Sequence, residues 1–193
     1  MVEMQIQRAA AWALLTEFVQ SESLRRHCLG VETAMRGYAR RLGEPEEEWG
    51  FVGLIHDFDY EIHPTLNEHP QAGLPILRDR GVPEWVIDAV ASHADHLDVP
   101  RDTQLKQTLF AVDELSGFIA AVAFVRPSRA VADVTVSSVR KKMKDKAFAR
   151  AVDRGAMAAG AELLGMELDE HIGVVLEAMQ GNADELGLAG VES

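Results

Sequence analysis

Six histidine and aspartate residues stand in an order that a metal site would need. They are His27, the adjacent pair His56-Asp57, then His69 and His93, and finally Asp113. Imidazole nitrogens and carboxylate oxygens are the side-chain donors that hold a borderline divalent cation at neutral pH. No other group of residues in the chain makes so specific a chemical prediction.

The adjacent pair restricts the local structure. Neighbouring residues in a helix interior point about 100° apart, so His56 and Asp57 serve one metal only from the end or a bend of a helix. Residues 49–55 are an apolar helical run, and this pattern breaks over residues 58–63, before Pro64. We therefore predict that the pair lies where a buried helix opens into a loop.

The order of these residues resembles the HD-domain superfamily of metal-dependent phosphohydrolases, over roughly residues 20–125. The signature of that superfamily is a His on one helix, a His-Asp doublet on a later helix, and an Asp further along the chain. The resemblance implies that His27, His56, Asp57 and Asp113 are metal ligands. It also implies an all-α fold, an HD-domain helical bundle with a C-terminal helical extension.

Some members of the superfamily, including cyclic-dinucleotide phosphodiesterases of the HD-GYP type and a few di-iron oxygenases, have two more His ligands before the last Asp. His69 and His93 occupy that interval, and the resemblance then implies that Asp57 bridges two metals. His96, on nearly the same helix face as His93, is an alternative ligand or an outer contact. Phe58-Asp59 replaces the Ile-Gly of HD-GYP proteins and no Gly-Tyr-Pro segment occurs, which argues against cyclic-dinucleotide cleavage.

The resemblance predicts hydrolysis of a phosphate ester, with nucleotides among the candidate substrates. A divalent metal would lower the pKa of a bound water and polarise a phosphoryl oxygen. Mixed nitrogen and oxygen donors suit Mn, Fe, Co, Ni or Zn better than Mg, with one or two ions per chain. The candidate catalytic residues are Asp57, Glu61 and His96, and Asp59 is a further candidate for proton transfer. A di-iron oxygenase on the same scaffold and a non-catalytic metal or nucleotide sensor remain alternatives.

Length and composition predict one domain. The chain has 193 residues, of which 47% are hydrophobic, enough for a sizeable core. We expect a single HD-type helical domain over residues 1–180, with its core at about 20–125 and C-terminal helices at about 126–180, followed by a flexible tail at 181–193. The first residues do not resemble a signal peptide and no apolar stretch approaches roughly 20 residues, which predicts a cytoplasmic protein with no membrane partner. The single cysteine, Cys28, is expected to be a small buried residue.

Charge is distributed unevenly along the chain. The net charge of −12 argues against a nucleic-acid polymer as partner. Residues 125–150 nevertheless contain eight basic and two acidic residues, a local net charge of +6. Such a run is usually a solvated face. The alternative is that Arg140, Lys141, Lys142 and Lys144 reach over the metal cleft and hold the phosphate of a small phosphorylated substrate.

Helix signals run through the whole chain. We predict helices at about 4–20, from Ser21 or Ser23 to Gly43, from Pro45 to the doublet, from Asn67 to Arg80, at 84–96 and at 103–125. Pro75 is expected to kink or split the fourth of these helices. Two or three helices should follow Pro127, with a short extended piece at 131–136. His171, beside two acidic residues, is expected to be exposed to solvent.

Overall fold

The computed structural model describes residues 4–190, and this part of the chain folds as helices joined by turns and loops. It contains no β-strand apart from an isolated bridge between Ala130 and Ala189. The predicted all-α fold is confirmed. The helices are α1 (Arg8–Phe18), α2 (Glu22–Leu42), α3 (Glu46–Ile55), α4 (Leu74–Asp79), α5 (Glu84–Ser92), α6 (Gln104–Phe124), α7 (Val136–Met143), α8 (Arg154–Leu163) and α9 (Leu168–Gly181), with short 3-10 turns η1 (Asp95–Leu97) and η2 (Val131–Asp133).

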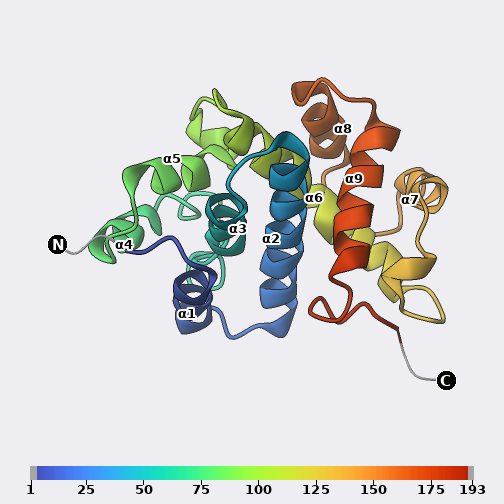
Figure 1. Ribbon diagram of the computed structural model, residues 1–193, viewed down its shortest axis with the longest axis horizontal. Coiled ribbons are helices and arrows are strands. Elements are labelled where there is room, and N and C mark those ends of the chain that lie inside the picture. Colours follow the sequence, from blue (N-terminus) through green and yellow to red (C-terminus); the bar gives the residue numbers. More distant parts are fainter. Residues whose placement is uncertain (1–3, 191–193) are drawn as a thin grey trace.

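Helices α2 and α6 form the centre of the molecule (Figure 1). α2 packs against α3, α6 and α9, whereas α6 packs against α5, α7, α8 and α9 as well. The ends of α2 are set by the residues that the sequence indicates. The Ser21 hydroxyl accepts a hydrogen bond from the Leu24 N–H, and Gly43 ends the helix in a left-handed conformation with φ 74°. Thr103 caps α6 in the same way as Ser21 caps α2.

Helix α6 would be able to cross a membrane if only its length and composition were considered. However, 56% of the most apolar 18-residue stretch of this helix is buried inside the protein. The core helix of a soluble protein meets the same criteria of length and composition. Its buried residues include Val112, Leu115 and Ile119, which belong to the hydrophobic core. Asp113 therefore projects from a helix that the core already holds in place.

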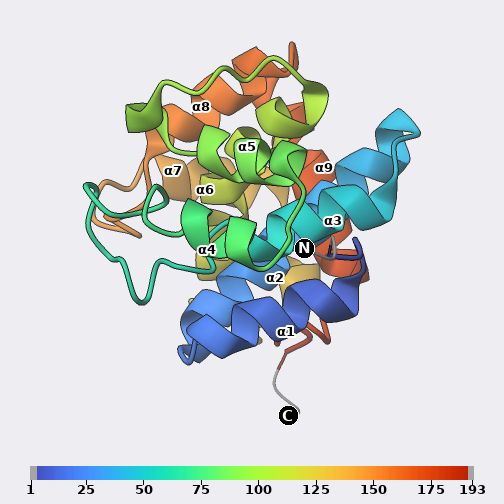
Figure 2. The ribbon, with the colours of Figure 1, turned by 90° about the vertical axis from the view of Figure 1, so that its left-hand side faces the viewer.

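The segment between α3 and α5 differs from the prediction. Residues 56–73 form a series of turns, visible as a long loop beside α4 in Figure 2, and α4 begins only at Leu74. Pro75 therefore occupies the first turn, where its missing N–H costs no helical hydrogen bond. As a result, His69 lies in the turns and not on a helix.

Helix α5 is also shorter than predicted, because it ends at Ser92. The Arg101 side chain donates hydrogen bonds to the carbonyl oxygens of Ser92 (2.9 Å) and His93 (3.2 Å). These two carbonyls at the helix end are thus satisfied without a further helical turn. His93 becomes the cap of α5, and His96 lies beyond it in η1.

The C-terminal part departs from two further expectations. Of the extended piece predicted at 131–136, Val131–Asp133 form the turn η2, residues 134 and 135 are extended, and α7 begins at Val136. The Gln180 side chain donates to the carbonyls of Val131 and Val134. The expected flexible tail is wrong for residues 182–190, because Leu186 and Leu188 are 2% and 1% exposed and the Val131 N–H donates to the Leu188 carbonyl at 2.8 Å. Residues 191–193 lie outside the described residues.

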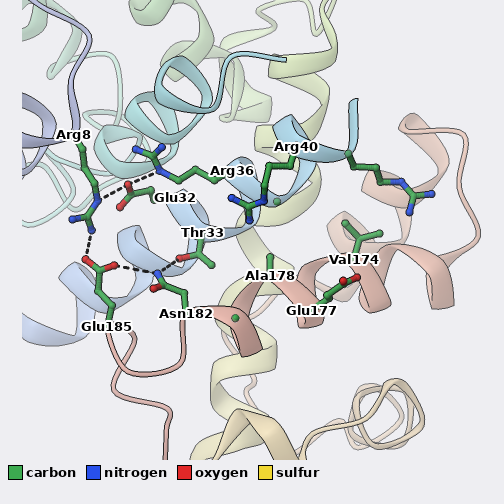
Figure 3. Close-up of a pocket in the computed structure, with 13 residues that line it drawn as sticks. Arg8, Glu32, Thr33, Arg36, Arg40, Val174, Glu177, Ala178, Asn182 and Glu185 are labelled. Atoms are coloured by element: carbon green, nitrogen blue, oxygen red, sulfur yellow. Dashed lines mark hydrogen bonds and ion pairs between the residues drawn. The ribbon is translucent and has the colours of Figure 1, made fainter. Parts of the chain in front are cut away.

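A polar network joins the first helix to the last part of the chain. It borders a groove of about 930 Å³ between α2 and α9 (Figure 3). The buried Glu32 carboxylate accepts hydrogen bonds from Nε of Arg8 (2.7 Å) and Nε of Arg36 (2.9 Å). Asn182, just after α9, donates to the Thr33 hydroxyl at 3.0 Å. These contacts fix α1 and the C-terminal segment against α2.

Glu32→Gln should therefore destabilise the protein. The change removes the negative charge that two guanidinium groups share, and we expect the free energy of unfolding to fall by about 2 kcal/mol. Chemical denaturation would measure the difference. Glu44→Gln, at an exposed position, is the matched control and should change little. Equal stability of Glu32→Gln and the unchanged protein would contradict this account.

Candidate metal centre

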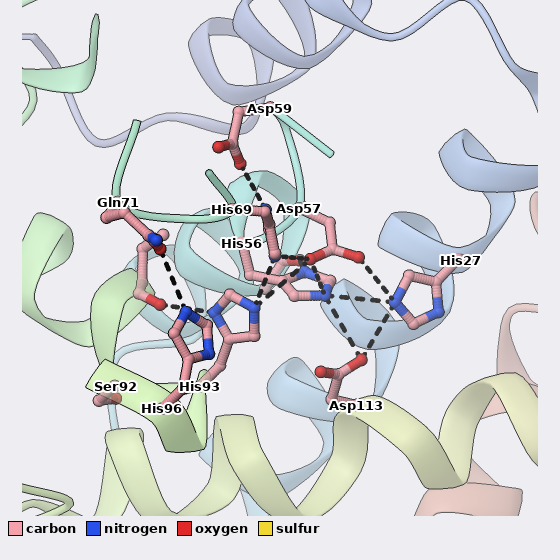
Figure 4. A network of polar contacts seen from close by, with 12 residues as sticks. His27, His56, Asp57, Asp59, His69, Gln71, Ser92, His93, His96 and Asp113 are labelled. Atoms are coloured by element: carbon pink, nitrogen blue, oxygen red, sulfur yellow. Dashed lines mark hydrogen bonds and ion pairs between the residues drawn. The ribbon is translucent and has the colours of Figure 1, made fainter. Parts of the chain in front are cut away.

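The structure brings the six histidine and aspartate residues into one cluster (Figure 4). The cluster consists of two groups of three, His27, His56 and Asp113 in one and Asp57, His69 and His93 in the other. Within each group, the candidate donor atoms all lie within 4.8 Å of one another. Each group could therefore hold a metal ion.

The elements that supply these side chains converge from four helices and one turn segment. His27 lies in the second turn of α2, and Asp113 lies near the middle of α6. His56 is the cap residue of α3, so the pair stands where a buried helix opens into turns, as predicted. His93 caps α5, which places both of these histidines at helix C-termini.

Helix-end carbonyls and one carboxylate orient three of the four imidazoles. Nδ1 of His56 lies 2.8 Å from the Gly53 carbonyl oxygen, and Nδ1 of His93 lies 2.6 Å from that of Val90. Nδ1 of His69 lies 2.9 Å from Oδ1 of Asp59. When Nδ1–H donates to these acceptors, Nε2 keeps its lone pair, which is the form that binds a metal.

The spacing of the Nε2 atoms tests whether a metal fits. Nε2 of His69 and Nε2 of His93 lie 3.1 Å apart, and the Nε2 atoms of His27 and His56 lie 3.2 Å apart. Two lone pairs that face each other at this distance repel unless a proton or cation lies between them. Nitrogen ligands about 2.1 Å from one ion, at tetrahedral or octahedral angles, are roughly 3.0–3.4 Å apart. The donors thus fit a metal ion.

The Asp57 carboxylate lies between the two groups. Its Oδ2 is 3.5 Å from Nε2 of His27, whereas its Oδ1 is 3.1 Å from Nε2 of His69 and 3.5 Å from Nε2 of His93. Asp113 belongs to the first group alone, with Oδ1 3.1 Å from Nε2 of His27. Oδ1 of Asp57 also lies 3.6 Å from Nε2 of His56, so the Asp57 carboxylate lies near imidazoles of both groups, with Oδ2 facing His27 and Oδ1 nearest to His69.

Burial and charge act in opposite directions on this cluster. Burial alone would lower the pKa of His27, but hydrogen bonds and charge from Asp113 and Asp57 outweigh it and raise that pKa to about 10. The pKa of His69 rises to about 9 for the same reason, through Asp57 and Asp59. Burial would raise the pKa of Asp57, yet the neighbouring imidazoles hold it below its usual range. In the metal-free protein, protons thus compete for the donor atoms.

Asp59 was a candidate for proton transfer, but the structure places it behind His69. The carboxylate is fully buried and contacts Nδ1 of His69, on the side of the ring away from the cluster. Gly73 packs so closely that a Cβ there would lie 2.5 Å from the Asp59 carboxylate carbon. This orienting role was missed, although an acidic residue two positions after the doublet was a visible signal.

Glu61 and His96, the other candidates for proton transfer, have different surroundings. The Glu61 carboxylate accepts hydrogen bonds from the backbone N–H groups of Gln20 (2.8 Å) and Ser21 (2.9 Å). It therefore stabilises the N-terminal end of α2, where negative charge is favourable, and the structure does not bring it into the cluster. His96 is exposed, with Nε2 3.1 Å from Oε1 of Gln71, and it belongs to neither group of candidate ligands.

The basic segment does not reach the metal cluster. Its residues Arg140, Lys141 and Lys142 belong to α7, which Figure 1 shows on the far side of α9 from α3 and α5. Arg140 forms an ion pair with Asp169 at 3.1 Å, and Lys144, at the end of α7, is exposed. The arrangement therefore does not support the prediction that these four residues hold the substrate phosphate, and a largely solvated face fits the structure.

Two other residues were assigned environments from sequence. Cys28 is buried, and burial raises the pKa of its thiol, as expected for a small core residue. His171 is not exposed as predicted. It is fully buried, with Nδ1 2.5 Å from the Tyr38 hydroxyl and Nε2 2.9 Å from the Ala111 carbonyl oxygen. It lies on the same face of α9 as the buried Ile172 and Val175. This burial was not predicted because two acidic residues directly precede His171 in the sequence.

A comparison with protein families agrees with the geometry. The family model of the HD domain matches residues 24–117, which include all six clustered residues. Residues 24–117 thus match an HD domain, and this match supports membership of the HD-domain superfamily. This superfamily includes metal-dependent phosphohydrolases, and HD domains bind divalent metals. Searches of curated proteins and of solved structures gave no match to the chain.

The Asp59 contact predicts an effect on metal affinity. Asp59→Ala removes the acceptor for Nδ1–H of His69, and loss of such a partner typically weakens metal binding about 10- to 100-fold. Asp59→Asn keeps an oxygen acceptor and should weaken binding less. Calorimetric titration with Zn²⁺ would measure both affinities, with circular dichroism to confirm that each variant is folded. Unchanged affinity in a folded Asp59→Ala protein would contradict the orienting role.

The raised pKa values predict a pH dependence. A metal binds only the neutral imidazole, so a proton held by His27 or His69 must leave first. Because their pKa values are about 10 and about 9, metal binding should release protons and become tighter as the pH rises toward 9. Titrations in buffers of different ionisation enthalpy would count the released protons. Affinity that does not change between about pH 6 and pH 9 would refute this prediction.

Proposed function

We propose that this protein is a metal-dependent hydrolase of a phosphate ester. The supporting observation is the position of Asp57 between the two groups, with Oδ2 3.5 Å from Nε2 of His27 and Oδ1 3.1 Å from Nε2 of His69. We infer two metal positions, one held by His27, His56 and Asp113 and the other by His69 and His93, with Asp57 between them. Two metal ions held in this way would stabilise the attacking and the leaving oxygens of a phosphoryl transfer.

The residues of the chain have separate tasks in this proposal. Bound divalent ions would lower the pKa of a water molecule and polarise a phosphoryl oxygen. In the reaction, water oxygen bonds to phosphorus, the ester P–O bond breaks, and the alcohol leaves with one proton from the water. The orienting contacts of His56, His69 and His93 hold the donors in place before substrate arrives. We propose that the exposed imidazole of His96 exchanges protons with solvent during the reaction.

The cofactor and substrate follow from the donor set and the charge of the chain. Four imidazoles and two carboxylates favour Mn, Fe, Co, Ni or Zn. A protein with a net charge of −12 is poorly suited to a nucleic-acid polymer, so we propose a small phosphorylated molecule as substrate. We further propose that the protein acts in the cytoplasm.

Metal analysis combined with phosphatase assays tests the proposal. The purified, metal-replete protein should contain about two ions per chain. His93→Ala should lower this content toward one, and Asp57→Ala should remove most bound metal and hydrolysis while the helical circular dichroism is preserved. The matched control is His63→Ala, in the turn segment outside the cluster, which should retain both properties.

The outcomes separate the alternatives. Full hydrolysis by Asp57→Ala would contradict the proposed site. A redox-active iron pair with oxygen consumption and no phosphatase activity would indicate an oxygenase, for which the same donors are suitable. Binding of phosphorylated ligands without turnover would indicate a sensor.

A further inference from the structure

A cavity of about 300 Å³ lies between α2 and α6, next to the metal cluster. His27, Gly30 and Gly117 line it where the two helices approach each other. The walls are mostly apolar and are formed by Ala120, Ala121 and Phe124 of α6, Met179 of α9, and Leu186 and Leu188 of the C-terminal segment. Its volume is at the lower end of the range for small-molecule pockets, about 300–1000 Å³.

The His27 imidazole connects this cavity to the metal cluster. Its Nε2 lies 3.1 Å from Asp113, on the cluster side. Its Nδ1 is on the opposite side of the ring, where a Cβ on Gly117 would lie 3.6 Å away. Gly117 is one turn beyond Asp113 on α6, so the cavity starts one helical turn from a candidate ligand. The cavity and the cluster therefore share the His27 imidazole, whose Nε2 faces Asp113 and whose Nδ1 lies beside Gly117 in the cavity wall.

Polar groups are few inside the cavity. Apart from His27, the polar lining residues are Ser23, Arg26 and Ser116. The Ser116 hydroxyl already donates to the Asp113 carbonyl at 2.9 Å, and the Arg26 guanidinium pairs with Glu22 at 2.9 Å. Hydroxyl groups of a bound sugar would find few partners here, and a buried polar group without a partner is costly. An apolar occupant is therefore favoured.

We propose that this cavity binds the organic part of the substrate, and that this part is a compact apolar group, such as an aromatic ring or a short branched chain. The inference rests on the proposed function for the position of the phosphate group. It specifies the substrate class, because it disfavours sugar phosphates and nucleotides. Nδ1 of His27 would be the one donor from the metal cluster that faces the occupant.

A substrate comparison tests the cavity within the metal-loaded enzyme. We expect 1-naphthyl phosphate to be hydrolysed with a higher kcat/KM than glucose 6-phosphate. Ala120→Leu places a larger side chain in the cavity, and the ratio of the two kcat/KM values should then fall about tenfold, as expected when about 1.4 kcal/mol of apolar burial is lost. The matched control is Ala13→Leu, on the exposed side of α1, which should keep the ratio. An unchanged ratio in folded Ala120→Leu would overturn the proposal.

Direct binding of 1-naphthol separates this inference from the proposed reaction. Calorimetry should detect binding to the unchanged protein, and Ala120→Leu should weaken it at least about tenfold. Gly117→Ala is a second variant, because the added methyl group makes only an ordinary contact with His27. It should also weaken binding. If no phosphate ester is hydrolysed but naphthol binds in this pattern, the proposed function fails and the cavity assignment stands. If esters are hydrolysed but naphthol does not bind, or binds equally to all variants, the cavity assignment fails alone.

Discussion

The arrangement of the molecule depends on two carboxylates that lie among helices with little access to water. Asp57 and Asp113 are 14% and 22% exposed at their side chains, and a negative charge in such a place requires positive charge close by. Imidazoles from α2, α3, α5 and the turn segment meet this requirement, either with protons or with metal ions. The helices that carry them must therefore converge on one point of α6, and the packing of the core serves that convergence.

Carbonyl groups at helix ends orient the imidazole rings within the cluster. A histidine that caps a helix donates from Nδ1 to a carbonyl in the last turn, as His56 does to Gly53 and His93 does to Val90, whose carbonyl also accepts from the His93 backbone N–H. The same contact satisfies the backbone and fixes the ring. His69 does not lie at the end of a helix, and the buried Asp59 carboxylate accepts the hydrogen bond from its Nδ1 instead of a backbone carbonyl. Asp59 in turn depends on the close approach of Gly73.

The sequence predicted the parts of this arrangement that follow from residue type and order. The all-α fold, the ends of α2 and the position of the doublet at the end of α3 were all visible in local patterns. Glu61 and the basic residues of α7 were misplaced because charge along a chain does not indicate which side of a bundle a helix will occupy. The end of α5 was not predicted because it depends on Arg101, several residues later in the chain. The Arg101 side chain donates hydrogen bonds to the carbonyl groups at the end of this helix.

The C-terminal segment has a consequence for how the molecule is completed during synthesis. All candidate ligands are translated by residue 113, whereas Leu186 and Leu188, which close the cavity beside His27, leave the ribosome much later. The ligand-bearing helices thus emerge before the wall of the neighbouring cavity exists. During that interval the inner face of α6 around Ala120 and Phe124 lacks its C-terminal cover, because the candidate ligands are in place in the sequence before the residues that close the cavity are synthesised.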